Sequence, residues 1–344
     1  MRKFRNHLII SLLSFSLIFA LVCCGEDDDE EVDVPQVSRA AYIVNGAAET
    51  LSVFDIETSE MKNDVLTLGK IPSDIRIHED KAYVVNYGDN SVQIIDLESL
   101  TETGIIDVGD GAGPEKIAFV DDSKAYVSCN STNSVKVIDL ASQQATKTIQ
   151  VGVTPWGVAA VGKKVYVCNT NAVFDLASGA MSYGDTTVSV IDSSTDQVVK
   201  DIDVGTNPTD IVVSGDKVVV LCTGDYADIP GELYVIDPVS DEVSEIINLR
   251  TIPYGIAASP GGMVYIVAFE GLIPVDISSG SVGVALTDFP GGSGLAFDSD
   301  GNGYVVVADW TGAGGDKLLV MDASGNLVGT HTPGGGASII AVRD

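Results

Sequence analysis

The chain has 344 residues, of which 45% are hydrophobic and 20% are charged, and its formal net charge is -30 at pH 7. This hydrophobic content excludes disorder over most of the length. The acidic balance excludes nucleic-acid binding as the main activity, because neutralising phosphates requires clustered Lys and Arg. We therefore expect a globular protein with a solvated acidic surface.

The N-terminal segment has the layout of a secretion signal. Basic residues at the start precede an apolar run over residues 8–22, which ends at Cys23 and Cys24. The run is short for a membrane span and is wrongly flanked. The sequence Leu21-Val22-Cys23-Cys24 resembles a bacterial lipobox, in which a small residue precedes the Cys that is acylated.

The lipobox resemblance implies a signal peptide over residues 1–23 and an acyl chain on Cys24. Cys23 as the acylated residue, or an ordinary cleaved signal, are the alternatives. The acidic run over residues 26–31 cannot be buried, so we expect residues 24–39 to form a solvated tether. Such a run is similar to the signal that sends Bacteroidetes lipoproteins to the outer face of the outer membrane. We expect an exported protein anchored to the bacterial outer membrane, in either orientation.

Residues 40–344 contain a repeated unit of several short apolar strands. An Asp ends the second strand of each unit, at intervals of 39 to 53 residues, as Asp55, Asp96, Asp139, Asp192, Asp237, Asp276 and Asp322. A Pro precedes the fourth strand of each unit, as Pro72, Pro114, Pro155, Pro208, Pro253, Pro290 and Pro333. The two landmarks count seven copies independently.

Such a unit is typical of a propeller blade, because one four-stranded sheet cannot hide both faces and must stack against neighbours in a ring. The strand Tyr83-Val84-Val85-Asn86 nearly spells the motif of the YVTN repeats, and the chain resembles that family over residues 40–344. Pattern and resemblance together predict an all-β, seven-bladed β-propeller with four antiparallel strands per blade. We expect each unit to form one contiguous blade, without a strand exchanged between the chain ends.

Two groups of residues could carry chemistry. Cys129, Cys168 and Cys222 lie in apolar strand sequence, and we expect buried thiols rather than a disulfide framework. The two histidines beyond the signal, His78 and His331, belong to different units and have no nucleophilic elbow nearby. A hydrolytic triad therefore has no support in the sequence.

A third candidate is a cation site. The run Asp298-Ser299-Asp300-Gly301-Asn302-Gly303 fits the spacing of a calcium loop, with Asp298, Asp300 and Asn302 as ligands. A tight turn between two strands is the favoured alternative. No cofactor other than this calcium is predicted. Each repeated Asp is expected to accept hydrogen bonds from the amides of the turn that follows it.

The loop aromatics gather on one expected face of the ring. If the strands run outward from first to fourth, the first-to-second and third-to-fourth connections share a face. It holds Tyr87, Trp156, Phe174, Tyr183, Tyr226, Tyr254, Phe269, Phe289 and Trp310. Exposed aromatics supply contact area at low entropy cost, so we predict ligand anchors at Trp156, Tyr183, Tyr226, Tyr254 and Trp310, with packing at blade edges as the alternative.

The Asn residues that end the first strands, Asn86, Asn130 and Asn169 among them, are expected either to offer amides at the same mouth or to cap turns. The leading hypothesis is a tethered binding module for a small molecule, a glycan or an envelope protein, and not an enzyme. A YVTN-like surface lipoprotein that captures cobalamin gives the specific version. The rival is a metal-dependent, lactonase-like hydrolase with convergent carboxylates in the channel, and the third is a structural envelope protein.

Overall fold

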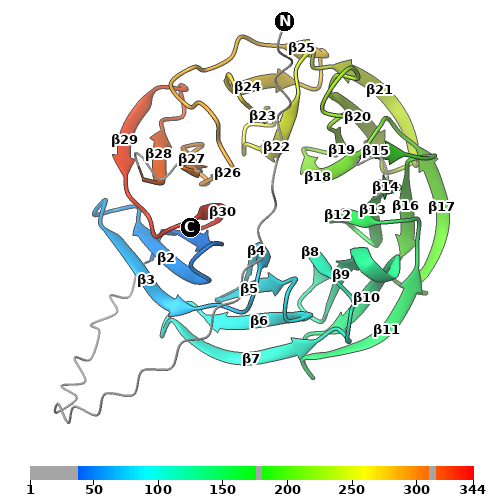
Figure 1. Cartoon of the computed structure of the whole chain (residues 1–344), viewed down its shortest axis with the longest axis horizontal. Helices are drawn as coiled ribbons and strands as arrows, with labels where there is room; N and C mark the ends of the chain where they lie inside the picture. Colours follow the sequence, from blue (N-terminus) through cyan, green and yellow to red (C-terminus); the bar gives the residue numbers. More distant parts are fainter. Residues whose placement is uncertain (1–37, 176–179, 310–314) are drawn as a thin grey trace, which may run out of the picture. The chain divides into compact units, whose positions relative to one another are not determined.

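The computed structural model describes residues 38–175, 180–309 and 315–344, which form one unit. Seven four-stranded antiparallel sheets stand around a common axis like the blades of a propeller (Figure 1). The predicted all-β, seven-bladed fold is confirmed. In the described part of the chain, none of the helical segments is long and apolar enough to cross a membrane.

Each blade has an inner strand, two middle strands and an outer strand. The inner strands are β4 (Pro72–His78), β8 (Pro114–Asp121), β12 (Pro155–Val161), β18 (Pro208–Ser214), β22 (Pro253–Ala258), β26 (Gly294–Phe297) and β30 (Ala337–Arg343). Their neighbours are β5 (Lys81–Asn86), β9 (Lys124–Cys129), β13 (Lys164–Asn169), β19 (Lys217–Cys222), β23 (Val264–Ala268), β27 (Gly303–Val307) and β1 (Ala40–Asn45).

The third strands are β6 (Ser91–Asp96), β10 (Ser134–Asp139), β16 (Thr187–Asp192), β20 (Glu232–Asp237), β24 (Gly271–Asp276), β28 (Lys317–Met321) and β2 (Thr50–Asp55). The outer strands are β7 (Thr101–Asp107), β11 (Gln144–Gln150), β17 (Gln197–Asp203), β21 (Glu242–Asn248), β25 (Ser281–Val282), β29 (Leu327–His331) and β3 (Met61–Thr67). A single turn of 3-10 helix, η1 (Asn130–Thr132), lies between β9 and β10.

The ring closes by an exchange of strands between the chain ends, so the prediction of contiguous blades is wrong. The C-terminal strand β30 pairs with the N-terminal strand β1, with Ala41 opposite Val342 and Ile43 opposite Ile340. The fourth strand of each repeat is the inner strand of the next blade, because a tight hairpin such as that at Glu79 joins it to the following strand. Backbone hydrogen bonds therefore join the two chain ends in one sheet.

The repeated Asp and Pro residues have the structural roles expected of them. The carboxylate of Asp96 accepts hydrogen bonds from the amides of Glu98 and Ser99, and the other six repeated Asp residues bond turn amides in the same way. Five of the repeated Pro residues begin inner strands, where a missing amide donor costs little. Pro290 and Pro333 instead precede their strands by a few residues.

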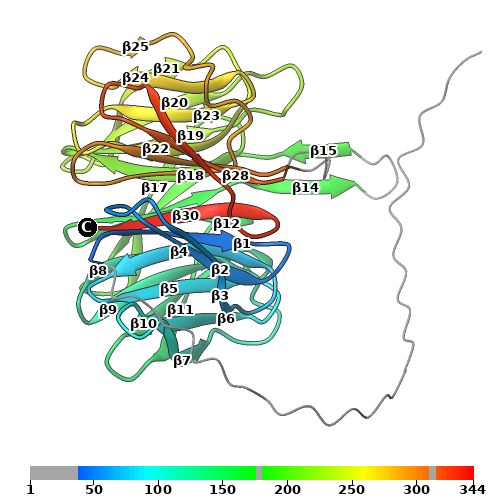
Figure 2. The ribbon, with the colours of Figure 1, turned by 90° about the vertical axis from the view of Figure 1, so that its left-hand side faces the viewer.

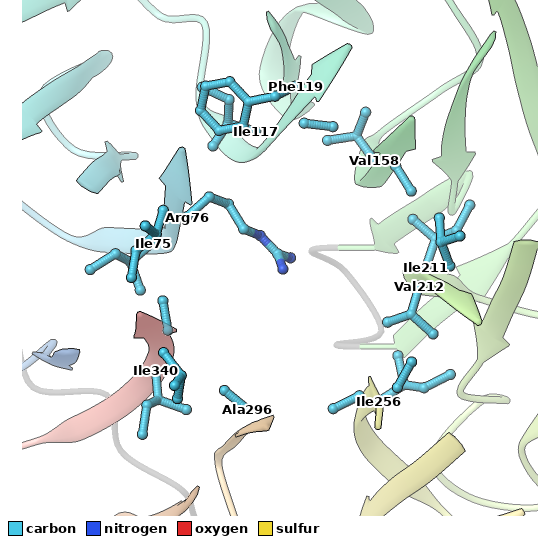
Figure 3. Close-up of a pocket in the computed structure, with 18 of the residues that line it drawn as sticks. Ile75, Arg76, Ile117, Phe119, Val158, Ile211, Val212, Ile256, Ala296 and Ile340 are labelled. Carbon is cyan, nitrogen blue, oxygen red and sulfur yellow. The ribbon is translucent and has the colours of Figure 1, made fainter. Parts of the chain in front are cut away.

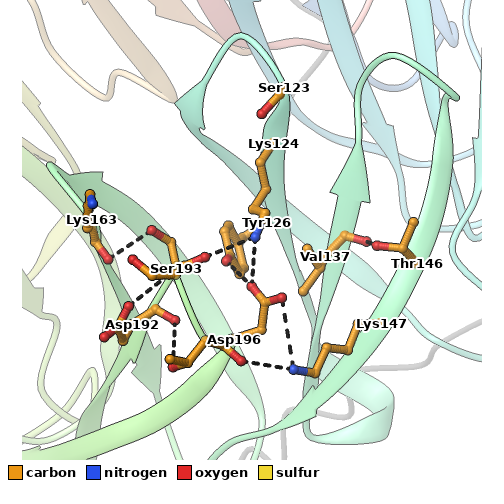
Figure 4. Close-up of polar contacts among 12 residues, drawn as sticks. Ser123, Lys124, Tyr126, Val137, Thr146, Lys147, Lys163, Asp192, Ser193 and Asp196 are labelled. Carbon is orange, nitrogen blue, oxygen red and sulfur yellow. Dashed lines mark hydrogen bonds and ion pairs between the residues drawn. The ribbon is translucent and has the colours of Figure 1, made fainter.

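Side chains on neighbouring blades form a repeated clamp (Figure 4). The hydroxyl of Tyr126 donates to Asp196 Oδ1 at 2.5 Å, and Lys124 Nζ lies 3.1 Å from the same oxygen. Tyr166 and Lys164 bind Asp241 one blade further on in the same way, at 2.6 Å each. Asp196 has a φ of 51°, a left-handed conformation that Asp tolerates well in turns. Sheet stacking is thus reinforced by charge-assisted hydrogen bonds.

The three cysteines are buried in the strands, as predicted. Cys129, Cys168 and Cys222 are free thiols on β9, β13 and β19. Burial raises the pKa of each thiol, to about 12 for Cys129. Such thiols stay protonated at neutral pH and pack as small apolar groups.

The ring has two faces that differ in relief. We call the loop face the one with the connections from second to third strands and from outer to inner strands. The opposite face, with the hairpins that follow inner and third strands, is the turn face. An extra hairpin, β14 (Ala172–Asp175) and β15 (Ala180–Tyr183), leaves the loop face between β13 and β16 and projects from the propeller (Figure 2).

Candidate functional site

The seven inner strands surround a cavity of about 520 Å³. We call this cavity the wide chamber; every inner strand contributes at least three consecutive residues to its wall (Figure 3). The wall is mostly aliphatic and includes Val158, Ile211 and Ile256. His78 and Phe119 stack face to face, with ring centroids 4.4 Å apart, toward the ends of β4 and β8. The chamber therefore lies toward the turn face.

A second, smaller cavity of about 150 Å³ continues the channel toward the loop face. We call it the narrow chamber. Asp74, Lys116 and Asp210 line it, together with Tyr254 near its loop-face end. Arg76 lines both chambers. The channel thus changes along its axis from polar to apolar.

Ion pairs line the narrow chamber. Lys116 Nζ lies 2.9 Å from Asp210 Oδ2, and both side chains are only 17% exposed. The pair joins β8 to β18 past β12, which carries Gly157 at that level. A Cβ atom on Gly157 would stand 2.9 Å from the Asp210 Cα, so glycine permits the close approach of β12 and β18.

Asp74 provides a second link between blades. Its buried carboxylate accepts hydrogen bonds from the Ile117 amide and from Arg76 Nε, both at 3.2 Å. The neighbouring Glu115 is 8% exposed. The pKa of Glu115 is raised to about 7, chiefly by burial; the Lys116 charge lowers it and the Asp74 charge raises it. The loop-face end of β8 therefore carries a buried carboxyl group with a pKa near neutral pH.

Two of the predicted aromatic anchors lie at the loop-face mouth of this channel. Trp156 and Tyr254 follow the first Pro of β12 and β22, and they are 37% and 54% exposed. Tyr254 also lines the narrow chamber. Phe289 was expected on this face, but it is wholly buried in the cluster of Val267, Leu272 and Val305. Phe289 is a packing residue.

Two further predicted anchors, Tyr183 and Tyr226, come together away from the channel. Tyr183 belongs to the β14–β15 hairpin, and Tyr226 lies in the loop after β19, where its hydroxyl accepts a hydrogen bond from Thr223. Burial raises the pKa of Tyr183, and nearby Tyr226 and Asp225 raise it further. Trp310 lies outside the described residues, as does the predicted lipidation site Cys24.

Two of the predicted amides are buried at the ends of their strands. Asn86 and Asn169 are each about 1% exposed, so neither amide lies open at the loop face. Asn169 Nδ2 instead donates to the hydroxyls of Thr187 and Ser189 on the adjacent strand. Asn130 begins η1, and its carbonyl oxygen accepts the Asn133 amide. Short polar side chains at a strand end bond locally more readily than they face solvent.

The predicted calcium loop is organised as a turn between β26 and β27. Asp298 is buried and accepts hydrogen bonds from Asn302 and from the Tyr304 hydroxyl. Arg39 lies 3.4 Å from Asp298 and 2.8 Å from Asp300. Arg39 therefore already pairs with both carboxylates, and also with Asp344. Among the residues described in the structure, no group of three or more His, Cys, Asp or Glu side chains is placed to hold a metal ion.

Sequence reasoning missed the channel and the cation Arg76, which lines both of its chambers. Arg76 occupies a position at which the other inner strands carry small apolar residues: Ala118, Ala159, Val212, Ala257, Ala296 and Ala341. The signal was available once the fourth strands were aligned by their Pro residues. Because those strands were expected at the outside of the blades, a departure from the repeat such as Arg76 did not point to a channel.

Fold and channel together define a seven-bladed propeller with a two-part central cavity. The family described as "Domain of unknown function (DUF5074)" matches residues 52–225, just over half of the chain. The chain belongs to this family. No functionally curated protein is significantly similar to it in sequence.

Solved structures share the fold at low sequence identity. A quinoprotein alcohol dehydrogenase-like protein from Bacteroides thetaiotaomicron has a TM-score of 0.67 and 16% identity, over 89% of this chain and 79% of its own. A functionally unknown protein from Desulfotomaculum acetoxidans has a TM-score of 0.66 and 17% identity, over 89% and 99%. Hydrazine synthase from Kuenenia stuttgartiensis has a TM-score of 0.65 and 19% identity, over 78% and 88%. At such identities the likeness shows the fold alone.

Proposed function

We propose that this protein is an exported, lipid-anchored binding propeller of the YVTN-repeat kind. Its ligand or envelope partner docks on the loop face at the mouth of the channel. The observation that carries the proposal is the exposure of Trp156 and Tyr254 at matching positions of two inner strands, with Tyr254 bordering the narrow chamber. Partly exposed aromatics beside a cavity are typical anchors for small molecules and glycans.

Binding is favoured over hydrolysis by the state of the channel carboxylates. A lactonase-like mechanism needs carboxylates that converge on a divalent cation. Asp74 and Asp210 are instead engaged by Arg76 and Lys116 within hydrogen-bonding distance. The carboxylates therefore act as links between strands, and a binding role needs nothing further from them.

Ligand screening by thermal shift tests the binding proposal. The purified protein is melted with cobalamin, calcium and a panel of oligosaccharides, because a ligand of the native state raises the apparent melting temperature. Cobalamin tests the nutrient-capture version directly. For the ligand that is found, Trp156→Ala and Tyr254→Ala should each weaken binding roughly 30-fold, as expected of hot-spot aromatics.

Phe269→Ala is the matched control, since Phe269 is another exposed aromatic of the loop face but lies in the turn after β23, away from the inner strands. It should bind normally. A ligand whose affinity is unchanged by both channel-mouth variants would contradict the proposed docking site.

The anchor is tested separately by labelling cells with palmitate. Cys24→Ser should abolish the label and release the protein from membranes, because two or more acyl chains are needed for stable anchoring. Continued labelling of this variant would mean that Cys23 is the acylated residue or that the lipobox assignment is wrong.

A further inference from the structure

The wide chamber differs from the narrow one in that the terminal nitrogens of a guanidinium face mostly aliphatic side chains, although its Nε is paired with Asp74. The Arg76 side chain extends from β4 into the cavity, where its guanidinium faces aliphatic residues of the opposite strands (Figure 3). Its hydrogen bond to Asp74 uses Nε. Within the described parts of the chain, the two terminal nitrogens of Arg76 donate no hydrogen bond of their own.

The other inner strands make room for this side chain. At the level of Arg76 they carry only Ala or Val, and the ring at the next buried level consists of Ile75, Ile117, Val158, Ile211, Ile256, Leu295 and Ile340. The result is a cavity of about 520 Å³ whose side chains are mostly aliphatic and whose wall also exposes polar atoms. That volume lies within the range of small-molecule sites, roughly 300 to 1,000 Å³.

We propose that the wide chamber binds an amphipathic organic anion, with its carboxylate or sulfonate on Arg76 and its apolar part against the aliphatic wall. A planar guanidinium with two free terminal nitrogens matches a carboxylate in a bidentate arrangement. An alkyl chain or aromatic ring gains from leaving water in such a cavity. This site is separate from the docking site on the loop face and does not depend on it.

The protein's overall charge of -30 opposes anion binding at long range. Screening limits that effect, because the Debye length is about 10 Å at 0.1 M salt. Inside the channel the carboxylate of Asp74 meets Arg76 Nε and is held by the Ile117 amide as well, and the charge of Asp210 also acts on Arg76. The affinity for an anion should therefore rise as salt is added up to about 0.1 M. At a site on a basic surface, added salt would lower the affinity.

A fluorescent amphipathic anion, 1-anilinonaphthalene-8-sulfonate, is the probe for the test. Titration of the purified protein should show one site per chain. Arg76→Gln should weaken that binding 10- to 100-fold, which corresponds to loss of a charge-assisted hydrogen bond. Arg76→Lys keeps the charge without the planar fork and should lie in between. Lys200→Gln, which removes a cation from outer strand β17, is the matched control and should bind as the unchanged protein does.

A second variant tests the chamber without touching the charge. Ala257 is 8% exposed and lines the cavity, so Ala257→Trp should fill it and abolish binding, with circular dichroism and melting used to verify the fold. Decanoate should displace the probe from the unchanged protein, whereas uncharged decanol at the same concentration should not.

Several results would overturn the proposal. They are no saturable binding by the unchanged protein, equal affinity in Arg76→Gln, unaffected binding in Ala257→Trp, or equal displacement by decanol and decanoate. Loss of probe binding in Trp156→Ala with Tyr254→Ala, but not in Arg76→Gln, would place the anion at the loop face. That outcome would reject the chamber site and leave the proposed function standing.

Discussion

The two ends of the central channel are built from the same seven strands but differ in how their charged side chains are used. Toward the loop face, Lys116 and Asp210 satisfy each other, and Asp74 is held by an amide and a guanidinium. Toward the turn face, aliphatic side chains surround a guanidinium whose terminal nitrogens are directed into the cavity. One end uses paired charges to hold strands together, and the other presents the terminal nitrogens of a guanidinium whose Nε already binds Asp74.

The difference teaches that polarity in a channel does not by itself mark a binding site. Buried charges that are paired mainly connect structural elements, and breaking one pair costs more than the pair contributes. Donor nitrogens that make no hydrogen bond and face aliphatic side chains are the better indicator of a ligand. Variants in the narrow chamber, and then in the contacts around it, separate charges that link strands from groups that bind a ligand.

The largest effect is expected from Lys116→Met, which leaves Asp210 buried and unpaired. The free energy of unfolding should fall by about 3 kcal/mol. The double variant Lys116→Met with Asp210→Leu should recover most of this loss, because no charge then remains buried. Chemical denaturation measures both. A single variant as stable as the unchanged protein would mean that the pair does not link β8 to β18.

A pH effect of similar size is expected from Glu115. Its folded pKa is about 7, against an ordinary value of 4.5. For an acid whose pKa is raised on folding, the folded state holds the proton longer, so stability falls as pH rises from about 4.5 through 7. The loss should approach about 3 kcal/mol. Glu115→Gln should remove this component, so the variant should match the unchanged protein at pH 4.5 and exceed it at pH 8. Parallel pH profiles of the two proteins would refute the assignment.

Close approach of β12 and β18 predicts a smaller loss. Gly157→Ala places a Cβ 2.9 Å from the Asp210 backbone and should cost about 2 kcal/mol through overpacking. Gly255→Ala is the matched control at the same level of β22, since its Cβ would meet only the Val267 side chain, at 3.7 Å. If both variants melt at the same temperature, the narrow chamber is less tightly packed than described.

The smallest effect is expected outside the channel, at the clamps between blades. Tyr126→Phe removes the hydroxyl that donates to Asp196 but leaves Lys124 on that carboxylate, so the loss should be about 1 kcal/mol. Tyr83→Phe, at the equivalent position of β5, should change the free energy of unfolding hardly at all, because that hydroxyl makes no hydrogen bond among the described residues. Equal losses would show that the clamp adds nothing beyond ring packing.

The sequence predicted the fold well because each unit carries the same turn-forming and strand-starting residues. Asp at strand ends and Pro at strand starts are visible without alignment to any other protein, and they carried the count of blades. The closure of the ring was predicted wrongly, although its signal was present. The two-residue turn at Glu79 and Asp80 already implied that the fourth strand pairs with the following unit, since so short a connection joins antiparallel neighbours.

The candidate site was predicted less well. The exposure of Trp156 and Tyr254 was predicted because each follows a Pro at the start of a strand. The burial of Asn86 and Phe289 depends on tertiary packing, which the periodicity of the sequence does not show. The channel residues were missed for a similar reason. An inner strand that contains Ala and Val looks like any core strand in the sequence. Only closure of the ring brings these residues around Arg76.

A crystal structure of the protein grown with decanoate tests the central claim most directly, because it shows which end of the channel holds a ligand. The account predicts the carboxylate within hydrogen-bonding distance of the terminal nitrogens of Arg76, with the alkyl chain along Val158 and Ile211 and the Lys116–Asp210 pair intact. Decanoate bound instead on Lys116 in a broken pair, or no decanoate in the wide chamber at a concentration that displaces the fluorescent probe, would contradict it.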